Sequence, residues 1–194
     1  MSNILTDASG ADLAVALWDP KYAFNVAQAI RIASCYGVPQ VWFNGNRVPL
    51  EGDKEKKVRL PREERMKGYR DVDICHAEYF FDAFPSDVVP VAVELTPSSE
   101  NLVHFEHPEK ALYVFGPEDG SLPKVARMHS HRVVQIPTRH CLNLSMAVGT
   151  VLYDRHYKRV LAGLEDPHDV ADAESRGYEF TEDREALEKE VGVG

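Results

Sequence analysis

The chain has 194 residues, of which 44% are hydrophobic and 27% are charged, and its formal net charge is −9. That length suits one domain with a sizeable core, and the composition is typical of a globular protein rather than a disordered or fibrous one. No apolar run approaches the roughly 20 residues that a membrane-spanning helix needs, and the N-terminus lacks the basic start and apolar stretch of a signal peptide. The sequence therefore predicts a cytoplasmic protein that does not act at a membrane.

Short apolar runs alternate along the chain with segments in which apolar residues recur at helical spacing. The runs predict six strands, over residues 12–18, 40–44, 71–75, 88–95, 110–116 and 132–137. The helical segments predict three helices, over residues 24–36, 121–129 and 143–161. Strands separated by helices predict an α/β fold, with a mostly parallel sheet and helices on both faces.

Charge is distributed unevenly along this chain. Residues 165–194 hold eleven acidic and three basic residues, a local charge of −8. Residues 46–70 hold nine Lys or Arg and five Asp or Glu, a local charge of +4. We predict a domain over residues 1–164 and an acidic C-terminal extension over residues 165–194, with one helix around residues 182–190. A basic loop on a nearly neutral domain is compatible with a polyanionic partner, and a solvated charged loop explains the charge equally well.

The cysteines and histidines do not follow a metal-binding pattern. The cysteines are odd in number and contain no C-x-x-C pair, which argues against a disulfide framework or a zinc ribbon and favours a reducing compartment. They are Cys35, Cys75 and Cys141. Two pairs of histidines lack carboxylate or thiolate partners at ligand spacing, and we expect them in solvated loops and at strand ends. They are His104 with His107 and His129 with His131.

Polar residues follow predicted strands or open predicted helices at three places, and ligands of open α/β sheets bind at such strand ends. The first place is the helix at residues 24–36, where Asn25 is positioned to cap free N–H groups. Arg31 follows six residues later among aliphatic residues. Its guanidinium would either reach solvent or grip a phosphate or carboxylate, and these residues taken alone favour the reading in which it reaches solvent.

The second place is the segment "VFGPEDGSLP", in which a buried strand ends at Gly116 and Glu118 follows. Glycines near a strand end permit tight turns and the close approach of a ligand to the backbone. The segment lacks the glycine patterns of dinucleotide-binding and ATP-binding loops. ATP and NAD are therefore not indicated, and the segment taken alone favours an ordinary strand–turn–helix connection with acidic capping residues.

The third place is "RHCLNLSMAVG", which leads into the last predicted helix. A nucleophilic Cys141 would need a base within hydrogen-bond reach, but its neighbour His140 is adjacent in sequence, and adjacent side chains usually diverge. No local signature of a cysteine hydrolase surrounds Cys141. Asn143 and Ser145 are instead suitable caps for the helix that follows.

Together, the three segments resemble the motifs of the SpoU/TrmH branch of the SPOUT methyltransferases, which transfer a methyl group from S-adenosylmethionine to RNA ribose. "FNVAQAIRIASCYGV" is similar to the first motif and holds Asn25 and Arg31 at the family's separation. "VFGPEDGSLP" is similar to the second, with Gly116 and Glu118 in place, and "VVQIPTRHCLNLSMAVGTVLYD" resembles the third. The motifs stand in the family's order, and the resemblance spans residues 13–159.

The resemblance implies a SPOUT fold, in which the C-terminal part of the α/β sheet is threaded into a trefoil knot, and a homodimer packed through the last helix. S-adenosylmethionine would lie in the knot, held largely by the backbone of three loops. The residues of this sequence that match those loops are Leu95, Gly116, Ile136, Cys141 and Leu142. Cys141 stands where the family usually has serine, and a thiol is a weaker hydrogen-bond partner than a hydroxyl.

The resemblance also implies catalytic roles. Arg31 would be the catalytic arginine, and it would fix the phosphate and hydroxyl of the RNA rather than remove a proton, because the pKa of a guanidinium lies above about 12. Asn25 and Glu118 would orient Arg31 and the loops, and Asn143 would fix the cofactor loop. The predicted substrate is tRNA, with residues 54–70 contacting its phosphates. The alternatives are methylation of rRNA, methylation of a base nitrogen, and a non-catalytic relative that only binds RNA.

Overall fold

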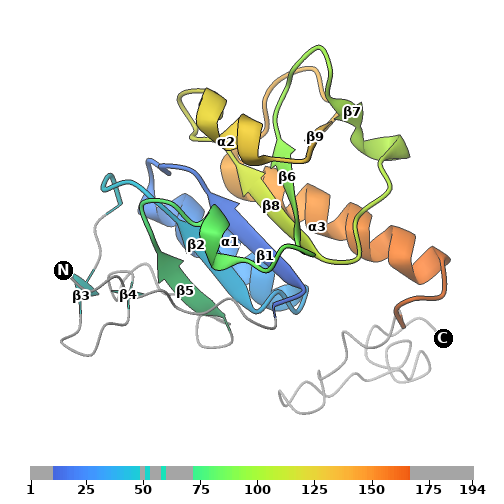
Figure 1. The fold of residues 1–194 in the computed structure, drawn as a ribbon, viewed down its shortest axis with the longest axis horizontal. Helices are drawn as coiled ribbons and strands as arrows, with labels where there is room; N and C mark the ends of the chain where they lie inside the picture. The colour runs from blue at the N-terminus through green and yellow to red at the C-terminus, as the bar shows by residue number, and fades with distance from the viewer. Residues whose placement is uncertain (1–10, 49–50, 53–57, 60–71, 167–194) are drawn as a thin grey trace, which may run out of the picture.

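The structure, a computed structural model, describes residues 11–48, 51–52, 58–59 and 72–166. Seven strands form one sheet in which every neighbouring pair is parallel (Figure 1). Their order across the sheet is β5-β2-β1-β8-β6-β9-β7. The strands are β1 Leu13–Leu17, β2 Gln40–Phe43, β5 Asp73–His76, β6 Val89–Val93, β7 Glu100–Asn101, β8 Ala111–Phe115 and β9 Arg132–Gln135.

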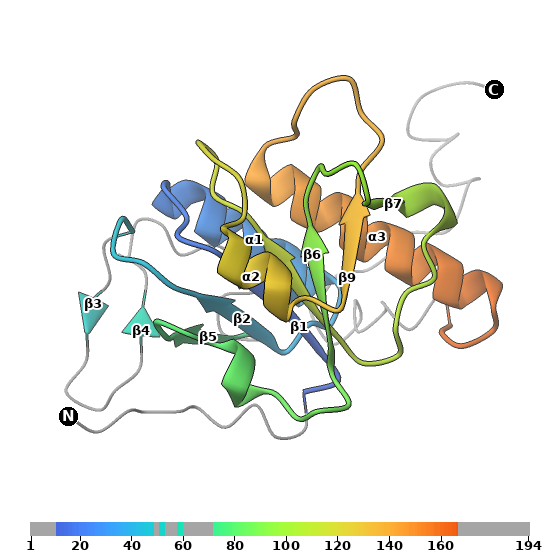
Figure 2. The ribbon, with the colours of Figure 1, turned by 45° about the horizontal axis from the view of Figure 1, so that its top comes forward.

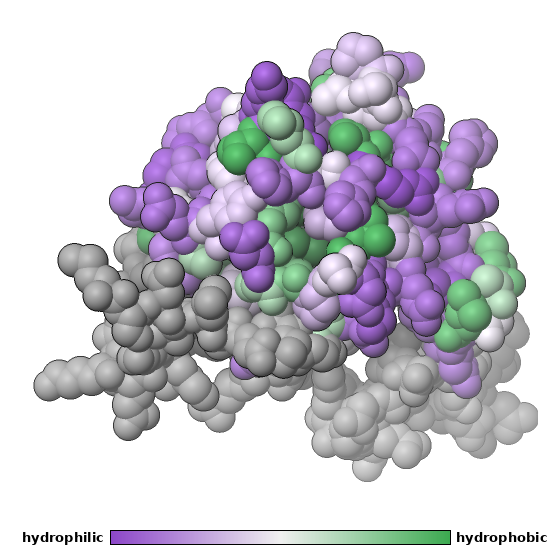
Figure 3. All heavy atoms as spheres, viewed as in Figure 1, coloured by the Kyte–Doolittle hydropathy of each residue, from purple (hydrophilic) through white to green (hydrophobic). Residues whose placement is uncertain are grey.

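Helices cover both faces of this sheet, because side chains alternate between the two faces of each buried strand. α1 (Ala23–Cys35) and α3 (Leu144–Leu161) pack on the face to which Val15 of β1 points. α2 (Lys124–His129) and the 3-10 helix η3 (Phe81–Ala83) lie on the other face of the sheet. There they pack against the β1 side chains that point away from the Val15 side. Figure 3 shows this second face, on which hydrophilic residues surround smaller hydrophobic areas.

α1 and α3 run side by side in the same direction. Gly149 of α3 lies against α1, so closely that a Cβ on it would be 3.6 Å from Cδ1 of Ile32. Further along, the ring of Tyr36 at the end of α1 has its centroid 6.1 Å from that of His156 in α3. Since α1 follows β1 and α3 follows β9, the starts of both helices lie together at the carboxyl edge of the sheet.

The turns that leave three adjacent strands also gather at this edge. Val93 of β6 is paired with Phe115 of β8 on one side and with Val134 of β9 on the other. Neighbouring strands are about 4.8 Å apart, so turns that begin one or two residues later lie close together. Figure 2 shows the three connections rising from the same end of the sheet.

The predicted α/β fold is confirmed, and all six predicted strands and three predicted helices are present, with ends that differ by at most three residues. The two-residue strand β7 and the antiparallel pair β3 (Glu51–Gly52) and β4 (Val58–Arg59) have no counterpart in the prediction, because such short strands show no periodicity. The predicted helix at residues 182–190 and most of the basic stretch 46–70 lie outside the described residues. The trefoil knot stays a prediction. Within the described ranges, every helix is too short or too polar to cross a bilayer.

A buried polar network ties the second half of α3 to the chain before β8. The side chain of His107 is 2% exposed, with Nδ1 2.6 Å from Oη of Tyr113 and Nε2 2.8 Å from Oδ2 of Asp154. Lys158 donates to the same Asp154 oxygen at 2.7 Å, and the buried Arg155 donates to two backbone carbonyls of the chain before β8. The expectation that His107 lies in solvent is therefore wrong, because its two ring nitrogens have partners inside the protein.

Candidate active site

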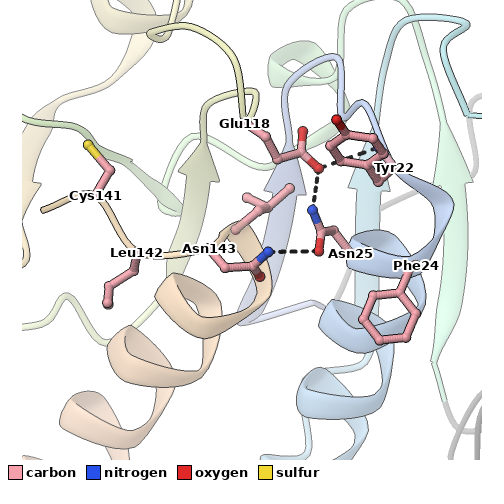
Figure 4. Close-up of a pocket in the computed structure, with 8 residues that line it drawn as sticks. Tyr22, Phe24, Asn25, Glu118, Cys141, Leu142 and Asn143 are labelled. Carbon is pink, nitrogen blue, oxygen red and sulfur yellow. Dashed lines mark hydrogen bonds between the residues drawn. The ribbon is translucent and has the colours of Figure 1, made fainter.

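Three of the predicted catalytic side chains form one hydrogen-bonded chain, although they come from three separate segments (Figure 4). Asn25 donates from Nδ2 to Oε1 of Glu118 at 2.6 Å, and Asn143 donates from Nδ2 to Oδ1 of Asn25 at 3.0 Å. Asn25 is only 4% exposed. Because buried polar groups are almost always paired, the two contacts fix the direction in which the Asn25 amide points.

The Glu118 carboxylate binds the chain that enters α1. The N-cap residue Tyr22 makes no capping bond with its own side chain, whereas the Glu118 carboxylate accepts from the backbone N–H of Lys21 at 2.8 Å and of Tyr22 at 3.4 Å. Free N–H groups and the helix dipole both favour a carboxylate at this position. The interpretation of Asn25 as the cap of α1 is therefore wrong. Asn25 is the third residue of the helix, and its side chain bridges Glu118 and Asn143.

Asn143 caps α3, as the sequence predicts. Its Oδ1 accepts from the backbone N–H of Ser145 at 3.0 Å and from the Ser145 hydroxyl at 2.7 Å. The Asn143 side chain is thus held by α3 through its oxygen and by Asn25 through its nitrogen. The starts of α1 and α3 are locked to each other and, through Glu118, to the loop after β8.

An open pocket of about 540 Å³ lies over this hydrogen-bonded chain. In Figure 4, Tyr22 and Phe24 stand on the α1 side of the chain, and Cys141 and Leu142 stand on the other side. A volume of this size is typical of small-molecule and cofactor sites, for which the range is roughly 300–1,000 Å³. The lining residues are Tyr22, Phe24, Asn25, Glu118, Cys141, Leu142, Asn143 and Leu144.

The other predicted cofactor residues lie on the three turns that converge beside this pocket. Leu95 follows β6, Gly116 follows β8 and Ile136 follows β9, and these three strands are neighbours in the sheet. The carboxylate of Glu94 joins two of the turns, because it accepts from the N–H of Leu95 at 2.9 Å and from the N–H of Leu122 at 2.6 Å. The turns therefore have a fixed separation at the carboxyl edge.

The residues on these turns fit S-adenosylmethionine. The side chains of Leu95 and Leu142 are 70% and 38% exposed, which leaves apolar surface for an adenine ring. Gly116 packs with its backbone against Leu122, whose nitrogen would lie 3.1 Å from a Cβ on residue 116. A side chain there would have to displace backbone, so the glycine keeps this turn tight. The individual roles of the five predicted cofactor residues stay predictions.

Arg31 lies outside the pocket of its own chain. An α-helix rises about 1.5 Å and turns about 100° per residue, so Arg31 stands about 9 Å along α1 from Asn25 and on a different side of the helix. Arg31 is exposed, and in the part of the chain that the structure describes it has no hydrogen-bond or ion-pair partner. It shares a helix face with Phe24, seven residues earlier, which does line the pocket. The catalytic role of Arg31 stays a prediction.

Cys141 is exposed at the pocket, and no hydrogen bond joins its thiol to a histidine of the described residues. A nucleophilic cysteine needs such a base, so the cysteine-hydrolase reading gains no support. Among the described side chains, no group of three His, Cys, Asp or Glu is arranged to hold a metal ion.

The sequence interpretation missed a charged cluster beside the pocket. Asp119, in the loop after β8, accepts two hydrogen bonds from Arg47 at 2.9 and 3.0 Å and pairs with Lys21 at 3.2 Å. Arg47, and to a smaller degree Lys21, lower the pKa of the Asp119 carboxyl. Arg47 also donates a hydrogen bond to the backbone carbonyl of Asp19. Among the described residues, Asp19 is the one non-glycine residue with a positive φ, 43°. Only the turn-forming "NGN" before Arg47 signals this arrangement in the sequence.

Comparison with known proteins agrees with this geometry. The model of the SpoU rRNA Methylase family matches residues 12–153. No curated protein is similar enough in sequence to match. The solved structure of a TrmH/SpoU tRNA modifying enzyme from A. aeolicus superposes with a TM-score of 0.65 at 17% identity, over 86% of this chain and 87% of that one.

Two further solved structures share the fold. A protein studied for the 2-OH methylation of C/U34 on tRNA has a TM-score of 0.61 at 23% identity, over 77% of this chain and 96% of that one. The SpoU methyltransferase AviRb from Streptomyces viridochromogenes, solved with the cofactor AdoMet, has a TM-score of 0.58 at 18% identity, over 77% of this chain and 61% of that one. These likenesses establish the fold, and the family match covers well over half of the chain. The chain belongs to the SpoU rRNA methylase family of RNA methyltransferases, whose cofactor is S-adenosylmethionine.

Proposed function

We propose that this protein is an S-adenosylmethionine-dependent RNA 2′-O-ribose methyltransferase that acts on tRNA. The observation that carries the proposal is the chain of hydrogen bonds from Glu118 through Asn25 to Asn143. Each of the three segments that resemble the family's motifs supplies one member of this chain. A pocket of cofactor size lies over it, beside the three converging turns.

Methyl transfer to a ribose hydroxyl requires alignment of the reacting groups more than activation of the methyl group. The bound cofactor supplies a methyl group already activated by a sulfonium, whereas a ribose 2′-hydroxyl is a weak nucleophile near neutral pH. Transfer then depends on placing that hydroxyl in line with the methyl group and on passing its proton to an RNA phosphate or to water. Asn25, Glu118 and Asn143 hold the walls of the pocket at a fixed separation. Arg31 fixes the phosphate and hydroxyl of the target nucleotide through its planar guanidinium, which cannot act as a base in a protein.

The active unit in this proposal is a homodimer. Exposed apolar side chains recur along α3 at helical spacing and form one stripe, consisting of Met146, Tyr153, Tyr157 and Leu161, each at least 50% exposed. The rings of Tyr153 and Tyr157 stack with centroids 6.1 Å apart. Exposed apolar surface of this kind is typical of protein interfaces. Because α3 lies beside α1, a second copy packed on the stripe would stand next to Arg31, which would then serve a site built by both copies.

The proposed substrate, tRNA, is supported by two of the similar structures, whose descriptions concern tRNA modification and tRNA methylation. The proposed contact to RNA phosphates is the basic segment 54–70. Most of this segment lies outside the described residues, but Arg47, which precedes it in the sequence, stands beside the pocket together with Lys21.

Transfer of tritiated methyl groups to purified tRNA and rRNA, followed by digestion to nucleosides, tests the proposal. We expect the label in a 2′-O-methylated nucleoside of tRNA. Label in a base would overturn the ribose assignment, and label confined to rRNA would overturn the tRNA assignment. Binding of RNA without any transfer would indicate a non-catalytic relative.

Charge reversal tests the RNA contact separately. Glutamate at Lys56, Lys57 and Arg59 should weaken tRNA binding and flatten its dependence on salt, because fewer counterions are released. Unchanged binding at every salt concentration would reject this role of the basic segment.

A further inference from the structure

Two aromatic side chains on the wall of the pocket are largely exposed. Tyr22 is 52% exposed and Phe24 is 55% exposed, and both line the pocket next to the buried Asn25. Aromatic side chains usually bury most of their surface, either in the core or against a binding partner. The hydrogen-bonded chain gives these rings no role, because its contacts near them use the backbone N–H of Tyr22 and the side chain of Asn25.

The two rings stand on the α1 side of the pocket, opposite the last predicted cofactor loop. Cys141 and Leu142, on the last predicted cofactor loop, line the opposite wall (Figure 4). Leu95, Gly116 and Ile136 lie outside the pocket. A cofactor held by those turns would enter the pocket from the wall of Leu142, which would leave the space in front of the rings for the molecule that accepts the methyl group.

A cation stands beside the Tyr22 ring. Nζ of Lys21 lies 5.3 Å from the centroid of the Tyr22 ring and 3.2 Å from Asp119. The hydrogen bond to Asp119 raises the pKa of Lys21, which keeps the ammonium charged at neutral pH. An aromatic ring next to a cation matches single-stranded nucleic acid, because a base stacks on the ring while its phosphate pairs with the cation. Arg31, on the same face of α1 as Phe24, extends this combination along the helix.

We propose that Tyr22 and Phe24 stack on unpaired bases of the RNA acceptor, the target nucleotide among them, while Lys21 contacts a phosphate. The inference rests on the proposed function. Every base has a stacking face, so the rings position a nucleotide without reading its identity. The acceptor is therefore an unpaired nucleotide of a loop or single strand, whose base is turned out toward the protein.

Steady-state methyl transfer to bulk tRNA by the full-length protein tests the stacking. Tyr22→Ala and Phe24→Ala should each raise KM for tRNA by about tenfold or more, as expected for the loss of one stacked base. Tyr22→Phe and Phe24→Tyr should keep the wild-type KM, because an aromatic face remains. The Kd of S-adenosylmethionine, measured by calorimetry, should stay at its wild-type value in all four variants. Met128→Ala is the matched control, since Met128 is 71% exposed on α2, on the other face of the sheet.

A second measurement separates this inference from the proposed function. A short single-stranded RNA with 2-aminopurine should lose fluorescence when its base stacks on the wild-type protein, and the alanine variants should lose this quenching. Quenching of that kind without methyl transfer by the wild type would overturn the proposed function and support the stacking. Unchanged KM and quenching in both alanine variants would overturn the stacking. Weaker S-adenosylmethionine binding, or a change from dimer to monomer in light scattering, would also overturn it, because the rings would then serve the cofactor or the partner subunit.

Discussion

Asn25 and Asn143 are separated by 118 residues in the sequence, and their side chains share a hydrogen bond of 3.0 Å. This bond joins the first turn of α1 to the cap of α3. Since Asn25 is also bonded to Glu118, a displacement of any one of the three segments strains the other two. The site is therefore held by side chains of the residues that the motifs single out, and not by the packing of the sheet alone.

Substitution of Asn143 separates its two contacts. Asn143→Ser keeps a capping oxygen for α3 and loses the bond to Asn25, whereas Asn143→Ala loses both. We expect Asn143→Ala to lower the free energy of unfolding by about 1–3 kcal/mol, because a cap is lost and a buried acceptor is left unpaired. Asn143→Ser should be less destabilised, yet bind S-adenosylmethionine more weakly than the wild type. Urea unfolding and calorimetry measure the two effects, and wild-type affinity in Asn143→Ser would show that the bond to Asn25 does not position the cofactor loop.

Arg31 should matter for turnover and not for stability. It is exposed and, among the described residues, unpaired, so Arg31→Ala should unfold at the wild-type urea concentration. Its kcat at saturating RNA should fall roughly 100-fold, a typical result of removing one donor that stabilises a transition state. Arg31→Lys keeps the charge without the planar fork and should recover only part of the rate. Arg127→Ala, an exposed arginine of α2, is the control. Full methyl transfer by Arg31→Ala would remove Arg31 from the catalytic machinery.

The elements that the sequence predicts well are those with several turns or alternations. α1 and α3 each show a repeated apolar face, and the buried strands are continuous apolar runs, so their periodicity is readable without knowledge of the partners. The site residues are predictable as individuals because they stand at strand ends and helix starts. Asn143, for example, is recognisable as a cap from the helix that follows it.

Contacts between distant segments cannot be predicted from periodicity or from a residue's local position in the sequence. The bond from Asn25 to Asn143 depends on how α1 packs on α3, and the burial of His107 depends on Asp154, 47 residues later. Neither pair has a local signature in the sequence. The prediction that Asn25 caps a helix is wrong, and so is the prediction that His107 lies in a solvated loop. A side chain near a helix start or in a loop can be taken up by tertiary partners, which local propensity does not describe.

The exposed apolar stripe on α3 predicts a dimer interface that one charged substitution can disrupt. Tyr157 is 50% exposed and stacks on Tyr153. Tyr157→Glu would place a charge in the proposed interface, and burial of an unpaired charge is strongly unfavourable. Light scattering should therefore show a monomer, and methyl transfer should fall with the dimer population. Met128→Glu adds the same charge to α2 and should remain dimeric. A dimer of unchanged stability in Tyr157→Glu would place the interface elsewhere.

His107 should make stability depend on pH. Burial lowers its pKa to about 4, against the smaller opposite effect of the hydrogen bond to Asp154. The neutral ring donates from Nε2 to Asp154 and accepts at Nδ1 from the Tyr113 hydroxyl, whose pKa burial raises to about 12. The unfolded chain binds the proton near pH 6.5, so stability is complete above that pH and falls by up to about 3 kcal/mol as the pH drops to about 4.

Urea unfolding at a series of pH values between these limits measures the effect. His107→Gln retains a donor and an acceptor but does not titrate, so its stability should change less with pH than that of the wild type. His129→Gln, at an exposed histidine, should keep the wild-type dependence. An identical pH dependence in His107→Gln and the wild type would assign the titration to other groups.

Gly45 and Asp19 constrain each other beside the pocket. Gly45 has φ +76°, and a Cβ on it would lie 2.0 Å from Oδ1 and 2.8 Å from Cγ of Asp19. Asp19 cannot easily retreat, because its N–H is bonded to Oδ1 of Asn44 at 2.6 Å and its carbonyl and carboxylate are bound by Arg47. Gly45→Ala therefore has to displace the Asp19 carboxylate, which Arg47 holds. We expect it to lower the free energy of unfolding by about 2–4 kcal/mol, the sum of an unfavourable φ and a displaced contact.

The matched control for this substitution is Gly37→Ala. Gly37 has φ +64° and nothing within 4 Å of a Cβ position, so this variant carries only the conformational cost, about 1–2 kcal/mol. The difference between the two urea midpoints isolates the contact with Asp19. Because Arg47 links Asp19 to Asp119 in the loop of Glu118, Gly45→Ala should also raise KM for tRNA, while Gly37→Ala should not. Equal loss of stability and equal KM in the two variants would mean that the side chain of Asp19 is free to move and does not hold the loop of Glu118 in place.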